Sequence, residues 1–144
     1  MNNNHLVPNR DKPATERWPQ RRVIWQCKSA QGILLVRYYL LQTRWLTVML
    51  HYLAASDDDR ALHDHPWAFV TVLLTSGYHE HTPQGRFWRR RFSVLHRPAE
   101  WQHRLELVEP CWTLVFRGAY VREWGFIVDR VWVQWKAYGR ALCD

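Results

Sequence analysis

The sequence predicts an all-β protein, and three observations carry that prediction. Short runs rich in valine, leucine and aromatic residues recur at intervals of about 8–12 residues, with turn-forming residues between them. No amphipathic stretch of convincing helical length appears before residue 136. Hydrophobic residues make up 47% of the 144 residues, and 10 of them are tryptophan, which is enough material for one packed core. A sandwich or barrel of about ten strands is therefore expected.

The expected strands follow one another with short connections. They cover residues 23–27, 33–41, 45–53, 68–74, 78–81, 87–95, 101–107, 111–117, 121–128 and 131–135. Turn signals lie at 31–32 and 76–77, and at 82–85, where proline and glycine take the second and fourth turn positions. A short helix is expected at 136–142. Residues 1–22 are polar and contain three prolines, so we interpret them as an extended arm, with residues 23–144 forming a single domain.

The chain is strongly basic. It has 20 lysine and arginine residues against 13 acidic ones, a formal net charge of +7, and arginine outnumbers lysine 17 to 3. This balance favours anionic substrates or partners, although an arginine-rich composition can equally reflect the base composition of a genome.

The cysteines and the apolar segments indicate a cytoplasmic protein. Cys27, Cys111 and Cys143 are far apart and form no CxxC pair, which argues against a disulfide framework and fits a reducing compartment. The N-terminus does not resemble a signal peptide. The most hydrophobic stretch, residues 33–55, is interrupted by Arg37 and Arg44, so a membrane span is not expected.

The segment around residue 64 is the most informative for chemistry. In a strand, His63 and His65 project to the same side while Asp64 points away. Two imidazoles at this spacing can share a metal ion. A third candidate ligand is His103, which follows a turn begun by Pro98. An isolated HxH pair is nevertheless common among ordinary surface or core histidines.

With these residues the sequence resembles the cupin superfamily over roughly residues 45–117. His63 and His65 match the HxH of the first cupin motif, and Gly77 matches its glycine. Pro98 and His103 match the second motif. The longer pattern HDHPWAF…SGY…RPAEWQHR also resembles small bacterial and phage-associated cupins. The resemblance implies a double-stranded β-helix barrel.

Three positions depart from the cupin motifs. Val70 stands where the first motif has its glutamate, Glu100 replaces a glycine of the second motif, and Leu107 replaces its asparagine. The resemblance therefore implies a metal site of three histidines, as in the thiol dioxygenases, which hold iron(II) this way. Iron is the expected divalent ion, with zinc, manganese and nickel as alternatives. A degenerate pocket without metal is the competing interpretation.

The strand expected at 78–81 offers supporting groups. Tyr78 and Glu80 share one face, and His79 and His81 share the other. If the first pair faces inward, which we favour, Glu80 is a fourth ligand or a base and Tyr78 donates a hydrogen bond to substrate. If the second pair does, His79 is the extra ligand. Water is the remaining candidate for that position, and a solvent-facing hairpin is the alternative to all of these.

The basic run at 89–91 and several tryptophans are candidate substrate contacts. Arg90 alternates with Arg89 and Arg91, and an inward-facing Arg90 would clamp a carboxylate or phosphate. A solvated sheet face is the commoner outcome for such a run. Trp67 and Trp101, beside the histidine segments, are expected to line an aromatic pocket, although such residues more often belong to the core.

These features lead to one main functional hypothesis and two alternatives. The first is a metal-dependent cupin enzyme, of dioxygenase or isomerase type, acting on a small polar molecule. The second is a non-catalytic cupin that binds a ligand or partner. The weakest is a nucleic-acid-binding barrel suggested by the charge, without a recognisable nucleic-acid motif. An edge strand within the first 45 residues offers a route to a homodimer.

Overall fold

Nearly all of the regular structure is β-strand, as predicted. The computed structural model describes residues 19–25, 32–57 and 61–138, so the predicted arm up to residue 18, and Cys27 and Cys143, lie outside the described residues. The strands are β1 (Gln20–Trp25), β2 (Ile33–Gln42), β3 (Thr47–Leu53), β4 (Leu62–His63), β5 (Phe69–Leu73), β6 (Tyr78–Thr82), β7 (Gly85–Arg89), β8 (Val94–Arg97), β9 (Arg104–Leu107), β10 (Cys111–Arg117), β11 (Gly125–Val128) and β12 (Val131–Gln134).

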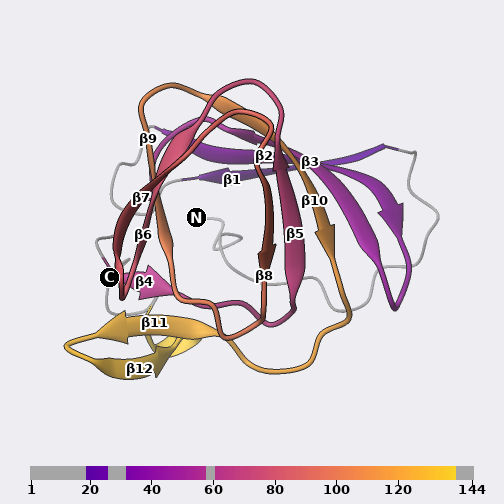
Figure 1. Cartoon of the computed structure of the whole chain (residues 1–144). Helices are drawn as coiled ribbons and strands as arrows, with labels where there is room; N and C mark the ends of the chain where they lie inside the picture. The colour runs from indigo at the N-terminus through magenta and orange to yellow at the C-terminus, as the bar shows by residue number, and fades with distance from the viewer. Residues whose placement is uncertain (1–18, 26–31, 58–60, 139–144) are drawn as a thin grey trace.

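Three antiparallel sheets build a barrel (Figure 1). The largest has six strands in the order β1-β2-β3-β10-β5-β8. A second sheet, β7-β6-β9, lies on the left of Figure 1, and a third, β12-β11-β4, lies at the bottom. Strands distant in sequence are neighbours, since β10 pairs with both β3 and β5. The barrel therefore brings the middle and the C-terminal part of the chain into contact.

The core follows from side chains that alternate between the two faces of each strand. In β3, β5, β6 and β10 buried residues alternate with partly exposed ones. One core cluster consists of Met49, Phe69 and Val115, and a second consists of Leu73, Tyr78 and Cys111. Both face the barrel interior, so the buried face of the large sheet is also the wall of any internal site.

Several expected element boundaries are wrong, for local reasons. The predicted strand 87–95 is two strands, because β7 ends at Arg89 and Phe92, with φ of 65°, turns the chain into the large sheet. The strand expected from residue 101 begins at Arg104, and that expected from 121 begins at Gly125. The predicted helix at 136–142 appears as one helical turn over residues 135–138, and the residues from 139 onward lie outside the described part.

Two glycines are required by close approach or by backbone angle. Gly85 adopts φ of 137° at the turn predicted between β6 and β7. A Cβ at Gly125 would lie 2.2 Å from the carbonyl oxygen of Val133, so only glycine lets β11 and β12 approach at this point.

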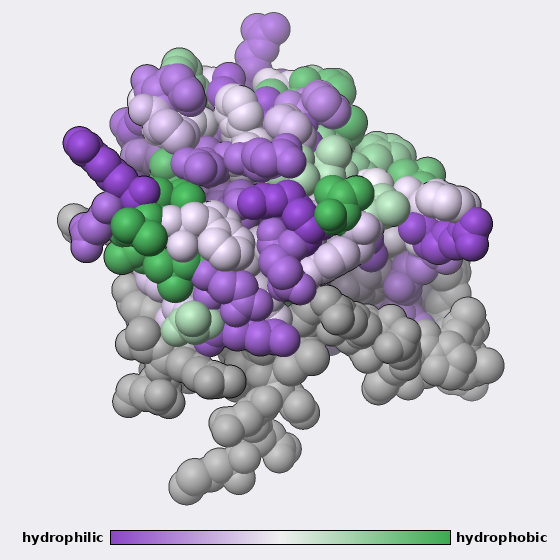
Figure 2. Space-filling view, turned by 90° about the horizontal axis from the view of Figure 1, so that it is seen from below, coloured by the Kyte–Doolittle hydropathy of each residue, from purple (hydrophilic) through white to green (hydrophobic). Residues whose placement is uncertain are grey.

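The described part of the face that carries β11 and β12 shows no single broad apolar area (Figure 2). Figure 2 shows this face from below, where hydrophilic residues dominate the described atoms and hydrophobic ones form separate groups. Across residues 19–25, 32–57 and 61–138, no helix is both long enough and apolar enough to cross a membrane.

Candidate metal centre

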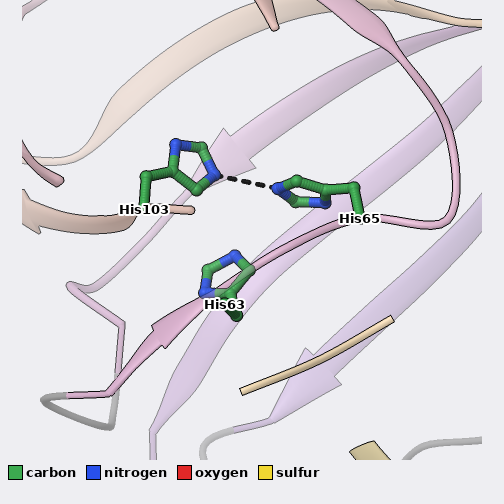
Figure 3. A group of neighbouring side chains, drawn as sticks. All are labelled: His63, His65 and His103. Carbon is green, nitrogen blue, oxygen red and sulfur yellow. Dashed lines mark hydrogen bonds between the residues drawn. The ribbon is translucent and has the colours of Figure 1, made fainter. Parts of the chain in front are cut away.

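The structure brings together the three predicted histidines from two segments (Figure 3). His63 ends β4, and its backbone exchanges hydrogen bonds with that of His103, 2.9 Å in each direction. The backbone N–H of His65 donates to the carbonyl of Ala99 at 3.0 Å. These backbone bonds hold the HxH segment against the residues between β8 and β9, so the histidine positions do not depend on side-chain packing alone.

The three imidazoles converge closely enough to share one ion. One nitrogen from each of His63, His65 and His103 lies within 4.8 Å of the others. The Nε2 atoms of His65 and His103 are 2.9 Å apart, and His63 lies edge-on to both rings. Three imidazole nitrogens facing one point are a donor set for a divalent transition metal.

Burial keeps two of these histidines in the neutral form that binds metals. Desolvation lowers the pKa of His63 from its usual 6.5 to about 4, although the nearby carboxylate of Asp57 opposes the shift. Desolvation also lowers the pKa of His65 well below its usual value. A neutral imidazole carries a free lone pair, so at pH 7 both rings are ready to act as ligands.

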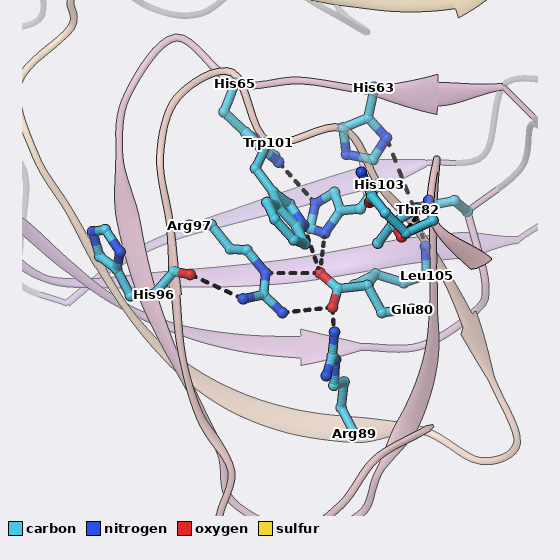
Figure 4. A network of polar contacts seen from close by, with 12 residues as sticks. His63, His65, Glu80, Thr82, Arg89, His96, Arg97, Trp101, His103 and Leu105 are labelled. Atoms are coloured by element: carbon cyan, nitrogen blue, oxygen red, sulfur yellow. Dashed lines mark hydrogen bonds and ion pairs between the residues drawn. The ribbon is translucent and has the colours of Figure 1, made fainter. Parts of the chain in front are cut away.

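Glu80 holds the third histidine in place rather than joining the ligands (Figure 4). Its side chain is 1% exposed and Oε1 accepts a hydrogen bond from Nδ1 of His103 at 2.9 Å. With its proton on Nδ1, His103 directs the lone pair of Nε2 toward His65. The expectation of Glu80 as a fourth ligand or base is therefore corrected, because it contacts the ring on the nitrogen that faces away from His65.

Three further side chains donate hydrogen bonds to the carboxylate of Glu80. Arg97 donates to both carboxylate oxygens, from Nε at 2.9 Å and from Nη2 at 2.6 Å. Arg89 donates at 2.7 Å, and the indole N–H of Trp101 donates at 3.0 Å. Burial would raise the pKa of Glu80, but the hydrogen bonds from His103 and Arg97 outweigh it and keep the pKa well below its usual range. Glu80 is thus a charged anchor at neutral pH.

The other candidate residues of β6, Tyr78 and His79, lie on the faces that the favoured interpretation predicts. Tyr78 faces inward but packs in the core cluster with Leu73 and Cys111. Burial raises its pKa well above the usual value, and among the described residues no hydrogen bond or ring contact joins it to the three histidines. His79 faces outward against the ring of Trp88. The structure therefore gives His79 no place beside the other histidines.

Arg90 is not the inward arginine, which corrects the expectation of a clamp there. Its side chain is exposed, because β7 ends one residue earlier and residue 90 belongs to the connection to β8. Arg89 is instead the member of the run that reaches the interior, where it binds Glu80. The basic run is thereby split between the two sides of the sheet.

The two predicted pocket tryptophans have different surroundings. Trp101 contacts Glu80, carries the guanidinium of Arg97 4.4 Å above its ring, and lines a cavity of about 250 Å³ beside Gln84 and Gln102. Trp67 packs on the Met49 cluster, with the guanidinium of Arg117 4.4 Å from its ring centre. They do not form one aromatic wall.

The sequence did not single out Asp64, which secures the segment between the ligands. It is 2% exposed and accepts hydrogen bonds from Arg122 at 2.5 Å, from the backbone N–H of Gly125 at 2.7 Å and from the indole of Trp132 at 2.9 Å. The β11–β12 hairpin is thereby held beside His63, where Phe126 contacts the imidazole. That Asp64 points away from His63 and His65 was predictable, but its partners lie about sixty residues later in the chain.

Comparison with solved structures decides the fold. A conserved protein with a double-stranded β-helix domain from Klebsiella pneumoniae superposes with a TM-score of 0.52 at 12% identity, covering 64% of this chain and 83% of that one. An RmlC-like cupin from Shewanella frigidimarina gives 0.53 at 11% identity, covering 74% and 91%. The chain has the cupin fold.

Another match spans almost the whole chain. The polyketide cyclase RemF from Streptomyces resistomycificus has a TM-score of 0.62 at 9% identity and covers 90% of this chain and 93% of its own. The iron(II) form of HppE matches with a TM-score of 0.52 at 11% identity, over 68% of this chain and 56% of HppE. No family model matches the sequence, and no curated protein does. At these identities the likeness concerns the fold alone.

Proposed function

We propose that this cupin-fold protein binds one divalent transition-metal ion through His63, His65 and His103 and acts on a small molecule there. The observation that carries the proposal is the convergence of three imidazole nitrogens within 4.8 Å of one another, with His103 buried and His63 and His65 partly buried. Iron(II) is the expected ion, with zinc, manganese and nickel as alternatives, because imidazole ligands select weakly among them.

The residues present fit such an ion. The pKa shifts of His63 and His65 favour neutral ligands, and Glu80 fixes the tautomer of His103. An ion held by only three protein ligands keeps open positions and would supply Lewis-acid polarisation or activation of oxygen there.

The other residues of the site orient His103 and exclude water from the imidazoles. Arg97 and Arg89 keep Glu80 charged, so that the proton on Nδ1 of His103 stays there. Phe69 contacts His65 at a ring distance of 4.6 Å, and Phe126 contacts His63 at 5.9 Å. These aromatic rings keep water away from the outer edges of the imidazoles and leave the centre of the triad for substrate.

Elemental analysis of the protein, purified without a histidine tag, tests the proposal. About one equivalent of a transition metal per chain is expected, and it should be lost in His65→Ala and His103→Ala. His96→Ala is the matched control, because the side chain of His96 is exposed on β8. His65→Ala is the safer of the two variants, since His65 makes no contact with Glu80. Metal that is absent even after reconstitution, or that persists in both variants, would refute the site.

A non-catalytic binding protein is the second candidate, favoured by one specific contact. The Nε2 atoms of His65 and His103 lie 2.9 Å apart, so the two rings can satisfy each other by a hydrogen bond without any ion. Val70 in place of the motif glutamate points the same way. This candidate predicts protein that stays free of metal after incubation with iron(II) or zinc and yet binds a small ligand.

A further inference from the structure

Two arginines that face the barrel interior bind no carboxylate among the residues that the structure describes. Arg37 of β2 lies opposite the buried His51 of β3, and Arg117 of β10 lies opposite the buried Thr47 and Phe69. Residues paired across antiparallel strands share one face of the sheet, so both arginines are on the inward face.

Their contacts leave much of each guanidinium without an acceptor. Arg37 donates from Nε to Nε2 of His51 at 3.0 Å, and its Nη1 lies 3.5 Å from the hydroxyl of Tyr39. Arg117 donates from Nη1 to the carbonyl of Gly118 at 3.3 Å. Among the described residues, Nη2 of Arg37 and both Nε and Nη2 of Arg117 bind no protein group.

Three other arginines, in contrast, each bind a buried carboxylate. Arg89 and Arg97 bind the carboxylate of Glu80, and Arg122 binds that of Asp64. A half-buried cation without a counter-ion is costly, and the cost falls when a ligand brings the negative charge. Arg37 and Arg117 are therefore placed to receive an anion.

The two arginines lie beside the histidine triad. Tyr39, which contacts Arg37, and Trp67, which carries Arg117 over its ring, both pack on the cluster of Met49, Phe69 and Val115. The ring of Phe69 is 4.6 Å from that of His65 and 6.0 Å from that of His103. Phe69 thus connects the cluster on which Tyr39 and Trp67 pack to the candidate metal ligands.

The ionisation of neighbouring groups agrees with this arrangement. Burial raises the pKa of Tyr39, but the charges and hydrogen bonds of Arg37 and Arg22 lower it further than burial raises it. Burial and the charge of Arg37 also lower the pKa of Arg117. The charges of Arg37 and Arg117 therefore act on each other and on the Tyr39 hydroxyl across the same space.

We infer that Arg37, Arg117 and the hydroxyl of Tyr39 bind the anionic oxygen group of a small acid. A guanidinium can bind two oxygens of a carboxylate or a phosphate side by side. The remainder of the molecule extends toward His63, His65 and His103. The direction of the remainder toward the histidines rests on the proposed function, whereas the anion site itself does not.

Calorimetric titration with chosen probes tests the inference. Succinate represents a carboxylate, inorganic phosphate represents a tetrahedral anion, and succinamide is the uncharged counterpart of succinate. Wild-type protein should bind succinate or phosphate and not succinamide. Arg37→Gln and Arg117→Gln should each weaken that binding at least about tenfold, as expected for losing hydrogen bonds to a charged group. Arg90→Gln removes the same charge from an exposed position and should leave binding within about twofold.

The outcomes separate this inference from the proposed function because the metal content of each preparation is measured alongside. Anion binding that depends on Arg37 and Arg117 supports the anion site, and if that protein also stays metal-free after reconstitution with iron(II) or zinc, the metal site is refuted. Bound metal with glutamine variants that titrate like wild type refutes the anion site and leaves the metal site standing. Wild type that binds neither probe also overturns the inference. If a glutamine variant does not fold, Arg37→Lys and Arg117→Lys take its place, and unchanged affinity in both would count against the site.

Discussion

The barrel interior contains two groups of arginines, which differ in whether a carboxylate of the protein neutralises their charge. Around Glu80, the guanidinium groups of Arg89 and Arg97 share one buried carboxylate with the imidazole of His103. On the wall formed by β2 and β10, Arg37 and Arg117 face neutral acceptors only, among the described residues. The first group is complete within the protein and positions a histidine, whereas the second has nitrogens open to an anion from outside. Counter-charge therefore distinguishes a structural arginine from a binding one.

The largest expected effect on stability comes from removing the carboxylate that neutralises the first group of arginines. Glu80→Gln removes the only negative charge among Arg89, Arg97 and His103, and uncompensated buried charge costs about 3–5 kcal/mol of the free energy of unfolding. Denaturant titration measures the loss. Glu106→Gln is the matched control, because Glu106 pairs with His81 and Arg86 at the surface and such pairs contribute little. Equal losses in the two variants would contradict the distinction.

The pH dependence of stability separates the neutral histidines from the charged glutamate. In acid the unfolded chain takes up protons near pH 6.5, whereas folded His63 stays neutral down to about pH 4. The free energy of unfolding should therefore fall between pH 6.5 and pH 4, by up to about 1.4 kcal/mol per pH unit for each such histidine. The lowered pKa of Glu80 acts in the same direction but at lower pH: its contribution is present above the ordinary glutamate pKa of 4.5 and is lost as the pH falls below it.

Unfolding of chelator-treated protein between pH 7 and pH 4 measures this dependence without interference from metal release. His63→Gln should flatten the slope between pH 6.5 and pH 4 and leave the further loss below pH 4.5 in place. A slope that is identical in wild type and His63→Gln would mean that His63 is protonated in the folded protein.

The smallest expected effect on stability comes from changing an arginine of the second group, which binds no carboxylate among the described residues. Arg117→Gln should change the free energy of unfolding by less than about 1 kcal/mol, since it loses mainly the contact with the Trp67 ring. Arg97→Gln should cost about 3–5 kcal/mol, because it leaves Glu80 buried with fewer donors. Thermal and denaturant unfolding in buffer without added anions compare the two. A large loss in Arg117→Gln would show that Arg117 has a structural partner.

Much of the fold followed from local patterns. The alternation of apolar residues predicted the all-β class and most strand positions, and the resemblance to cupins predicted the barrel that the structure comparisons bear out. Boundaries failed where the chain leaves one sheet for another, as between Arg89 and Val94, because a run of strand-forming residues does not reveal a bend.

The candidate site was predictable in part. The HxH spacing places His63 and His65 on one side, and the second motif supplied His103. The choice of Arg90 over Arg89 failed, because alternation sorts the run into two faces without saying which is inward. Arg37 and Arg117 carried no motif, and in the sequence they stand as single charges within apolar strands.

What the sequence by itself determined is local: the period of two in the strands, the shared direction of His63 and His65, and the shared face of Tyr78 and Glu80. The tertiary structure alone decided which groups meet. Glu80 receives donors from β7, β8 and the residues that follow β8, and Arg37 and Arg117 become neighbours of one cluster through the register of β2, β3 and β10. The physical reason is that strand periodicity sets the face on which a side chain lies, whereas register and sheet curvature set its distance from side chains on other strands.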